Sequence, residues 1–214
     1  MIKNGHKVLF IGDSITDSNR HRAHAPLGDG YVKLFRDLML FRQPTVTVQV
    51  VNKGIGGNKV TQLRDRWADD VLRERPDWLS IKVGINDLIS HLCSPDDPVT
   101  PRIYAEVYDG VLSRTRQALP ACRILLIDPF FLSLEPFSET LWRGRVLKAL
   151  PDYLEVVQEL SEKYETRHLK THERFQHLLQ SHSVECFAPE PVHPHTTGHL
   201  AIAEWVYDEL NGLG

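Results

Sequence analysis

The chain has 214 residues, 42% of them hydrophobic and 25% charged, and a formal net charge of -3. This length suits one well-buried α/β core and is short for two, so we expect a single domain over residues 1–214. The slight negative charge argues against nucleic acid or an anionic membrane as a partner. No apolar stretch approaches the roughly 20 residues that span a bilayer.

The N-terminal segment and the cysteines predict a cytoplasmic protein. The sequence leads from Met1 almost directly into the apolar run Lys7–Ile11. A signal peptide would need this run as its apolar region, whereas the fold needs it as the first core strand. The cysteines, Cys93, Cys122 and Cys186, are odd in number and have neither metal-binding nor Cys-x-x-Cys spacing. Reduced thiols, as in the cytoplasm, explain them best.

Apolar runs rich in β-branched residues alternate along the chain with segments of helical period. The expected strands are Lys7–Ile11, Thr45–Val51, Trp78–Val83, Arg123–Asp128 and Arg167–Lys170. The expected helices are Gly30–Phe41, Lys59–Arg73, Pro101–Ala118, Leu147–Tyr164, Glu173–Ser181 and Thr197–Leu210. Near-continuous hydrophobicity indicates parallel strands that are covered on both faces. We therefore predict a three-layer α/β/α fold, a flavodoxin-like open sheet of about five parallel strands.

Three longer connections leave the carboxyl ends of expected strands, where open α/β sheets place their ligand crevice. They are Ser18–Asp29, Ser90–Thr100 and Pro129–Arg145. Loops of this length in a compact domain are usually functional or disordered. The third begins with the aromatic stretch from Pro129 to Phe137, which is too apolar for disorder. This stretch is either a pocket wall or a loop packed over the core.

Four short blocks contain the residue types needed for acyl transfer. Gly12–Ile15, Asn52–Asn58 and Gly84–Asp87 each lie at the end of an apolar run, and Glu190–His193 precedes the last expected helix. Together they contain a hydroxyl nucleophile, groups able to donate hydrogen bonds to an oxyanion, and an acid three residues before a base. This is the inventory of a serine hydrolase.

The first two blocks also admit other interpretations. Ser14 alone could be a helix cap. The glycine-rich block from Asn52 to Asn58 could suggest dinucleotide binding, but it follows the second strand, and Lys59 stands where the third glycine of that fingerprint belongs. Glycines that serve only a tight turn are compatible with function, because such a turn can direct the Gly57 N–H inward.

The other two blocks likewise have structural alternatives. Asn86 could start an Asx turn, which would also account for Asp87. His193 and His195 could suggest a metal site, but the intervening proline prevents helical pairing and no further ligand set accompanies them. We therefore expect neither a metal nor a cofactor.

The order and spacing of the four blocks resemble those of the SGNH (GDSL-type) esterases, from about Phe10 to the final helix. The resemblance implies that Ser14 is the nucleophile and His193 the base. It also implies an oxyanion hole formed by the Ser14 and Gly57 backbone N–H groups and the Asn86 side chain, with Asn52 and Gly54 as supporting turn residues.

The acidic member of the expected triad departs from the family pattern, because Glu190 stands where the family has aspartate. Hydrolase triads accept either carboxylate. The additional methylene requires the side chain to fold back to reach Nδ1 of His193. Alternatively, Glu190 faces solvent and a backbone carbonyl orients His193.

Within the family, the chain is most similar to the short acetylxylan or acetyl-xylooligosaccharide esterases. The segments that carry this similarity are Lys7–Asp17, Val51–Ile55 and Val83–Asp87. It implies deacetylation of sugars and assembly into a homo-oligomer. Two alternatives are a thioesterase or lysophospholipase acting on longer acyl chains, and a non-catalytic carbohydrate- or acyl-binding module that retains the cleft.

Overall fold

The computed structural model describes residues 1–134 and 141–212. Its sheet has five strands in the order β2-β1-β3-β4-β5, and every neighbouring pair is parallel. The strands are β1 (Lys7–Gly12), β2 (Gln49–Gly54), β3 (Trp78–Lys82), β4 (Arg123–Ile127) and β5 (Arg167–Leu169). The predicted fold class is thus confirmed, and the carboxyl ends of all five strands lie at one edge.

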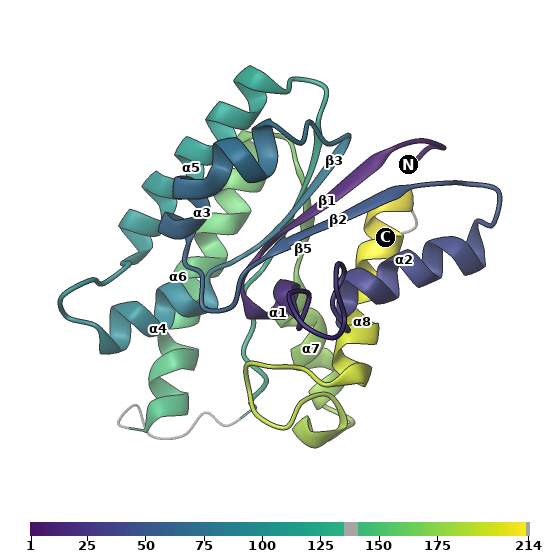
Figure 1. Ribbon diagram of the computed structural model, residues 1–214. Helices are drawn as coiled ribbons and strands as arrows, with labels where there is room; N and C mark the ends of the chain where they lie inside the picture. Colours follow the sequence, from purple (N-terminus) through teal and green to yellow (C-terminus); the bar gives the residue numbers. More distant parts are fainter. Residues whose placement is uncertain (135–140, 213–214) are drawn as a thin grey trace.

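Helices cover both faces of this sheet (Figure 1). They are α1 (Ser14–Asp17), α2 (Tyr31–Arg42), α3 (Val60–Trp67), α4 (Ile85–Cys93), α5 (Pro101–Ala118), α6 (Trp142–Lys163), α7 (Thr171–Leu179) and α8 (Thr196–Asn211). Two short turns of other pitch complete the described elements, the π-helical Ala68–Leu72 and the 3-10 Val184–Cys186. No described helix combines the length and apolarity needed to cross a membrane.

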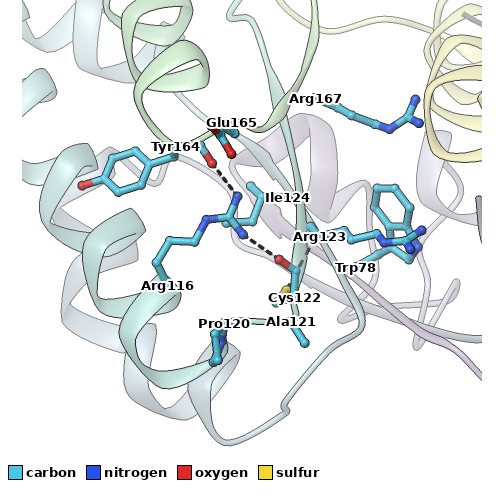
Figure 2. Close-up of a pocket in the computed structure, with 10 residues that line it drawn as sticks. All are labelled: Trp78, Arg116, Pro120, Ala121, Cys122, Arg123, Ile124, Tyr164, Glu165 and Arg167. Atoms are coloured by element: carbon cyan, nitrogen blue, oxygen red, sulfur yellow. Dashed lines mark hydrogen bonds between the residues drawn. The ribbon is translucent and has the colours of Figure 1, made fainter.

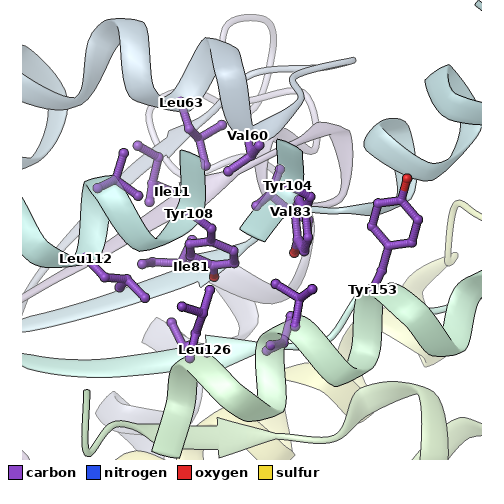
Figure 3. Packing of buried hydrophobic residues seen from close by; sticks show 14 of the residues in the cluster. Ile11, Val60, Leu63, Ile81, Val83, Tyr104, Tyr108, Leu112, Leu126 and Tyr153 are labelled. Carbon is purple, nitrogen blue, oxygen red and sulfur yellow. The ribbon is translucent and has the colours of Figure 1, made fainter. Parts of the chain in front are cut away.

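The core has two halves because strand side chains alternate between the faces of the sheet. In β1, Leu9 and Ile11 pack with residues of α3, α5 and α6, and Figure 3 shows this half around Tyr104 and Tyr108. Phe10 faces the opposite side and packs with residues of α2, α7 and α8. This alternation also determines which face each polar strand residue occupies.

Some element boundaries differ from the sequence-based expectations. β2 begins at Gln49 rather than Thr45 and continues to Gly54. The helix expected over residues 59–73 changes to π-helical hydrogen bonding after Trp67. α6 begins at Trp142 and runs through Pro151. A buried apolar stripe that begins at Val146 and includes Leu150, Tyr153 and Val157 stabilises this helix in spite of the proline.

Two of the long connections also differ from expectation. The residues after Gly84 form α4, so the expected connection from Ser90 begins inside a helix that ends at Cys93. In the third connection, Phe130, Phe131 and Leu132 are buried in the core, which favours a loop packed over the core. The remainder of its aromatic stretch, from residue 135 on, lies outside the described residues.

Candidate active site

Ser14 is the first residue of α1, immediately beyond the carboxyl end of β1. The cap of this short helix is Asp13, whose Oδ1 accepts the backbone N–H of Ile15 at 3.0 Å. Gly12 allows the chain to turn here because it has no side chain. A Cβ at this position would lie 2.2 Å from the Lys82 carbonyl oxygen. The capping role considered for Ser14 therefore belongs to Asp13, and the Ser14 hydroxyl is available for another partner.

The Ser14 hydroxyl contacts His193, and His193 contacts Glu190. Ser14 Oγ lies 2.9 Å from His193 Nε2, and His193 Nδ1 lies 2.6 Å from Glu190 Oε1. An ionised carboxylate can only accept hydrogen bonds, so the ring proton is on Nδ1. Nε2 is then free to accept the proton of the Ser14 hydroxyl. These atoms form a continuous hydrogen-bonded chain from the carboxylate to the hydroxyl.

The Glu190 side chain folds back on its own turn. Oε1 also accepts the backbone N–H of His193 at 2.7 Å, and Oε2 accepts that of Val192 at 2.9 Å. Both oxygens are therefore fixed by the loop that supports the imidazole. This geometry is that of a carboxylate that orients His193, and it differs from the solvent-facing alternative.

The glycine-rich block after β2 packs against α1. Asn52 is buried, and its Nδ2 donates to the carbonyl oxygens of Thr16 and Leu27 at 2.7 and 2.8 Å. Its Oδ1 accepts the Gly54 N–H at 2.8 Å. Gly54 tolerates no side chain, because a Cβ there would lie 2.2 Å from the Asp17 nitrogen. Asn52 and Gly54 thus hold this block against the segment that contains Ser14.

Gly56 and Gly57 follow, and Gly56 lies next to Ser14 and Asp17 of α1. The Gly56 N–H donates to Asp17 Oδ2 at 2.9 Å, and a Cβ on Gly56 would lie 4.0 Å from that of Ser14. Gly57 has a φ of +78°, a conformation that favours glycine. Sequence reasoning missed Asp17, because its bond to a residue 39 positions away is a tertiary contact without a local signal.

Asn86 connects the third block to the second. It lies in the first turn of α4, and its Nδ2 donates to the Asn58 carbonyl oxygen at 3.2 Å. The next residue, Asp87, is fully buried, and its Oδ1 accepts the Val60 N–H at 2.8 Å. Burial raises the pKa of Asp87 to about 7. The structure therefore brings the blocks of Ser14, Gly57, Asn86 and His193 together at the carboxyl edge of the sheet.

The remaining histidines of the His193 segment have structural contacts. His195 caps α8, because its Nδ1 accepts the Thr197 N–H at 3.2 Å. His199 is buried against Tyr31, whose N–H donates to its Nδ1 at 3.2 Å, and burial lowers its pKa to about 4. Within residues 1–134 and 141–212, no three His, Cys, Asp or Glu side chains are grouped as metal ligands.

The cleft beside Ser14 and His193 is small, polar and open. It has a volume of about 280 Å³ and is lined by Ser14, Ile15, Asp17, Ser18, Asn19, His193, Pro194 and His199. The side chains of His193 and Glu190 are 56% and 45% exposed. The imidazole and the carboxylate are thus accessible from solvent.

A larger hollow of about 540 Å³ lies at the opposite edge of the sheet (Figure 2). It is lined in part by Trp78, Arg123 and Arg167, which begin β3, β4 and β5. Arg116 in its wall donates to the carbonyl oxygens of Cys122 and Tyr164 at 2.8 and 2.6 Å. Burial raises the pKa of the Cys122 thiol to about 12, so this hollow offers no thiolate nucleophile.

A hydroxyl, an imidazole and a carboxylate in one hydrogen-bonded chain at the carboxyl edge of a parallel sheet are the constellation of a serine hydrolase. Comparisons with known proteins agree with this class. The chain belongs to the GDSL-like lipase/acylhydrolase family, whose model matches residues 10–201. It is a carboxylic ester hydrolase of that family.

Relatives match nearly the whole chain. The acetylxylan esterase of Geobacillus stearothermophilus is 33% identical over 98% of this chain and 95% of its own length. Its crystal structure superposes with a TM-score of 0.86 over the same shares, at 32% identity. A structure from Parabacteroides merdae assigned to the GDSL-like lipases gives a TM-score of 0.89 at 29% identity, covering 100% of this chain and 99% of that one.

The Geobacillus structures include catalytic mutants in which a serine, an aspartate and a histidine are each replaced by alanine. In that enzyme the aspartate precedes the histidine by three positions. Glu190 precedes His193 by the same interval.

Proposed function

We propose that this protein hydrolyses small acyl esters, above all acetyl esters of carbohydrates, through an acyl-enzyme on Ser14. The observation that supports this proposal best is the chain from Ser14 Oγ through His193 to Glu190, with contacts of 2.9 and 2.6 Å. In it, a neutral imidazole accepts from the nucleophile on one side and donates to a carboxylate on the other.

In the first half of the reaction, Ser14 Oγ attacks the ester carbonyl carbon while His193 Nε2 takes its proton. Glu190 stabilises the imidazolium that forms. The tetrahedral intermediate collapses when His193 returns this proton to the departing sugar oxygen, which leaves as a hydroxyl group. The acyl group remains on Ser14.

In the second half, water attacks the acyl-enzyme and His193 takes a proton from that water. The intermediate collapses with Ser14 Oγ as the leaving group. The proton returns to Ser14, and the carboxylic acid is released. No further co-reactant is needed to balance these two steps.

The proposed oxyanion donors are the backbone N–H groups of Ser14 and Gly57 and the side-chain amide of Asn86. An amide nitrogen carries two protons, and one of those on Asn86 is bonded to the Asn58 carbonyl oxygen. That bond fixes the plane of the amide and leaves the second proton for the developing oxyanion. Fixed donors of this kind act mainly in the transition state.

Two features support an acetylated sugar as the substrate. A relative that matches 98% of this chain is an acetylxylan esterase. The cleft beside Ser14 is small, and residues such as Asp17, Ser18 and Asn19 give its wall polar groups. A long acyl chain would require an extended apolar channel, so this cleft disfavours the thioesterase or lysophospholipase alternative.

The proposal is tested by comparing kcat/KM for p-nitrophenyl acetate, butyrate and octanoate, and for acetylated xylo-oligosaccharides. We expect activity to fall steeply with chain length and the acetylated sugars to be deacetylated. Octanoate turnover equal to acetate turnover would favour the long-chain alternative. Absence of turnover with every ester would favour a non-catalytic binding module.

We further propose a homo-oligomer of single-domain chains that acts in the cytoplasm, without a metal or cofactor and without nucleic acid or membrane as partner. The cytoplasmic location is supported by Cys93, Cys122 and Cys186, all of which are free thiols. The oligomer is supported by the resemblance to the acetylxylan esterase subgroup, and light scattering of the purified protein tests it.

A further inference from the structure

Lys82 is a buried lysine at the carboxyl end of β3, only 1% exposed. Strand alternation directs it to the same face as Trp78, which packs in the half of the core with α2 and α8. Removing an ammonium group from water is costly unless an opposite charge and hydrogen bonds compensate it. A buried lysine in this position therefore needs a specific partner of opposite charge.

That partner is Asp13, the residue immediately before Ser14. Lys82 Nζ lies 3.2 Å from Asp13 Oδ2, and the Asp13 side chain is itself fully buried. The two residues are also joined through the backbone, because the Asp13 N–H donates to the Lys82 carbonyl oxygen at 3.3 Å. The face of the Phe130 ring covers the ammonium, with its centroid 4.8 Å from Nζ.

Other charged groups near Lys82 agree with a paired ammonium. Burial lowers the pKa of the Lys82 amine below its usual value, and the nearby carboxyl groups of Asp13 and Asp87 offset only part of this shift. His199, which faces Lys82 from α8, is neutral because burial lowers its pKa to about 4. Asp13 is the carboxylate with a hydrogen bond to Nζ.

Asp13 links Lys82 to the backbone around the nucleophile Ser14. While Oδ2 pairs with Lys82, Oδ1 holds the Ile15 N–H at the start of α1. Ser14 lies between Asp13 and Ile15 in the chain. Its backbone is therefore fixed on both sides. A buried carboxylate without a counter-charge would also repel the negative charge that develops on the substrate oxygen near Ser14.

We propose that Lys82 is a positioning residue for ester hydrolysis, which pairs with Asp13 to fix the Ser14 backbone and to neutralise the buried charge beside the oxyanion hole. This inference rests on the proposed function. It predicts that loss of the Lys82 charge lowers the rate of acyl-enzyme formation in protein that remains folded, with little effect on substrate binding.

The test compares Lys82→Met, Asp13→Asn and the double variant with the wild type on p-nitrophenyl acetate. Methionine keeps the length of the side chain without its charge, and asparagine keeps an oxygen that can accept the Ile15 N–H. Lys7→Met is the matched control, because Lys7 forms an ion pair with Glu74 at the amino end of β1, 3.2 Å between Nζ and Oε2. Thermal unfolding and circular dichroism determine the folded fraction, to which kcat is normalised.

We expect Lys82→Met to lower kcat by about 10- to 100-fold with KM within about threefold, and Lys7→Met to leave both unchanged. The double variant should recover part of kcat, because it removes both unpaired charges but does not restore the pair that fixes the Ser14 backbone. A merely structural pair would change the unfolding temperature but not the kcat of the folded protein, and that result overturns the proposal.

If Lys82→Met does not fold, Asp13→Asn tests the proposal instead, because it breaks the same pair while keeping the helix cap. A kcat within about threefold of wild type for Asp13→Asn overturns the proposal, and a fall of about tenfold at constant KM supports it. The wild type and Ser14→Ala are measured in the same assay. Absence of a difference between these two would refute the proposed function itself.

Discussion

Glu190 accepts both the ring N–H and the backbone N–H of His193 on the same carboxylate oxygen, at 2.6 and 2.7 Å. The longer side chain therefore does not leave the imidazole loosely held. It closes a turn of four residues, from Glu190 to His193, in which one carboxylate oxygen fixes both the backbone and the ring of the base. The additional methylene of glutamate relative to aspartate is absorbed by this folding back.

This relationship predicts that Glu190→Gln strongly impairs catalysis. Glutamine offers one acceptor oxygen but carries no charge to stabilise the imidazolium. In a comparable triad the loss of the carboxylate costs about 10⁴ in kcat. We expect a decrease of this order, with little change in KM, measured on p-nitrophenyl acetate.

Glu190→Asp is the matched variant, because it keeps the charge and restores the residue typical of the family. It should retain far more activity than Glu190→Gln, although the shorter side chain must reposition to keep both bonds to His193. If Glu190→Gln stays within a few-fold of wild type while circular dichroism shows a native fold, the enzyme works as a Ser14–His193 dyad.

Ser14→Ala should abolish turnover and leave the fold intact, because the hydroxyl contacts His193 but does not cap α1. Loss of a triad nucleophile costs on the order of 10⁶ in kcat. The measurement needs protein free of host esterases, with the unfolding temperature as the check on stability. Appreciable acetyl esterase activity in pure Ser14→Ala would remove Ser14 from the mechanism.

Asn86→Ala should lower kcat by about 10² to 10³, which is the usual cost of losing one oxyanion donor. KM should change little, since the oxyanion exists only in the transition state. The side chain also bonds the Asn58 carbonyl oxygen, so stability must be measured in parallel. Asn86→Asp keeps the size of the side chain but loses the donor, and we expect a similar or larger loss.

The fold and the meeting of the four sequence blocks could be predicted from sequence because their signals are local. β-branched apolar runs between helical segments specify a parallel sheet, and blocks at strand ends must meet at its carboxyl edge. The sequence also allows Asn86 to start an Asx turn, whereas the residues after Gly84 begin α4. Asn and Asp favour both turns and the first turn of a helix, so the local pattern does not separate the two.

Lys82 and Asp17 show what the sequence could not provide. Lys82 stands in an apolar run, and its partner Asp13 is 69 positions away along the chain. Asp17 is bonded to Gly56 across a loop. Pairings of this kind depend on strand order and register, which no local pattern encodes. The sequence shows that the glutamate at position 190 departs from the family pattern, but the folded-back geometry of its side chain depends on the turn that the structure shows.

Asp87 makes stability depend on pH in a direction that can be calculated. Burial raises its pKa from 3.8 to about 7 in the folded protein. Between about pH 4 and pH 7 the unfolded chain has released this proton while the folded protein retains it. Rising pH therefore favours the unfolded state through this window, and the effect levels off above about pH 7.

The variant Asp87→Asn isolates this effect, because asparagine resembles the protonated acid and can still accept the Val60 N–H. Relative to wild type, it should gain stability steadily from pH 5 to pH 7 and remain more stable at pH 8. Urea unfolding of both proteins at each pH gives the difference between their free energies of unfolding. The contributions of the other titrating groups cancel in this difference. Asp65→Asn, at a side chain that is 61% exposed, is the control and should show no such trend. A stability difference for Asp87→Asn that stays constant from pH 5 to pH 8 would show that this carboxyl group does not titrate in that range.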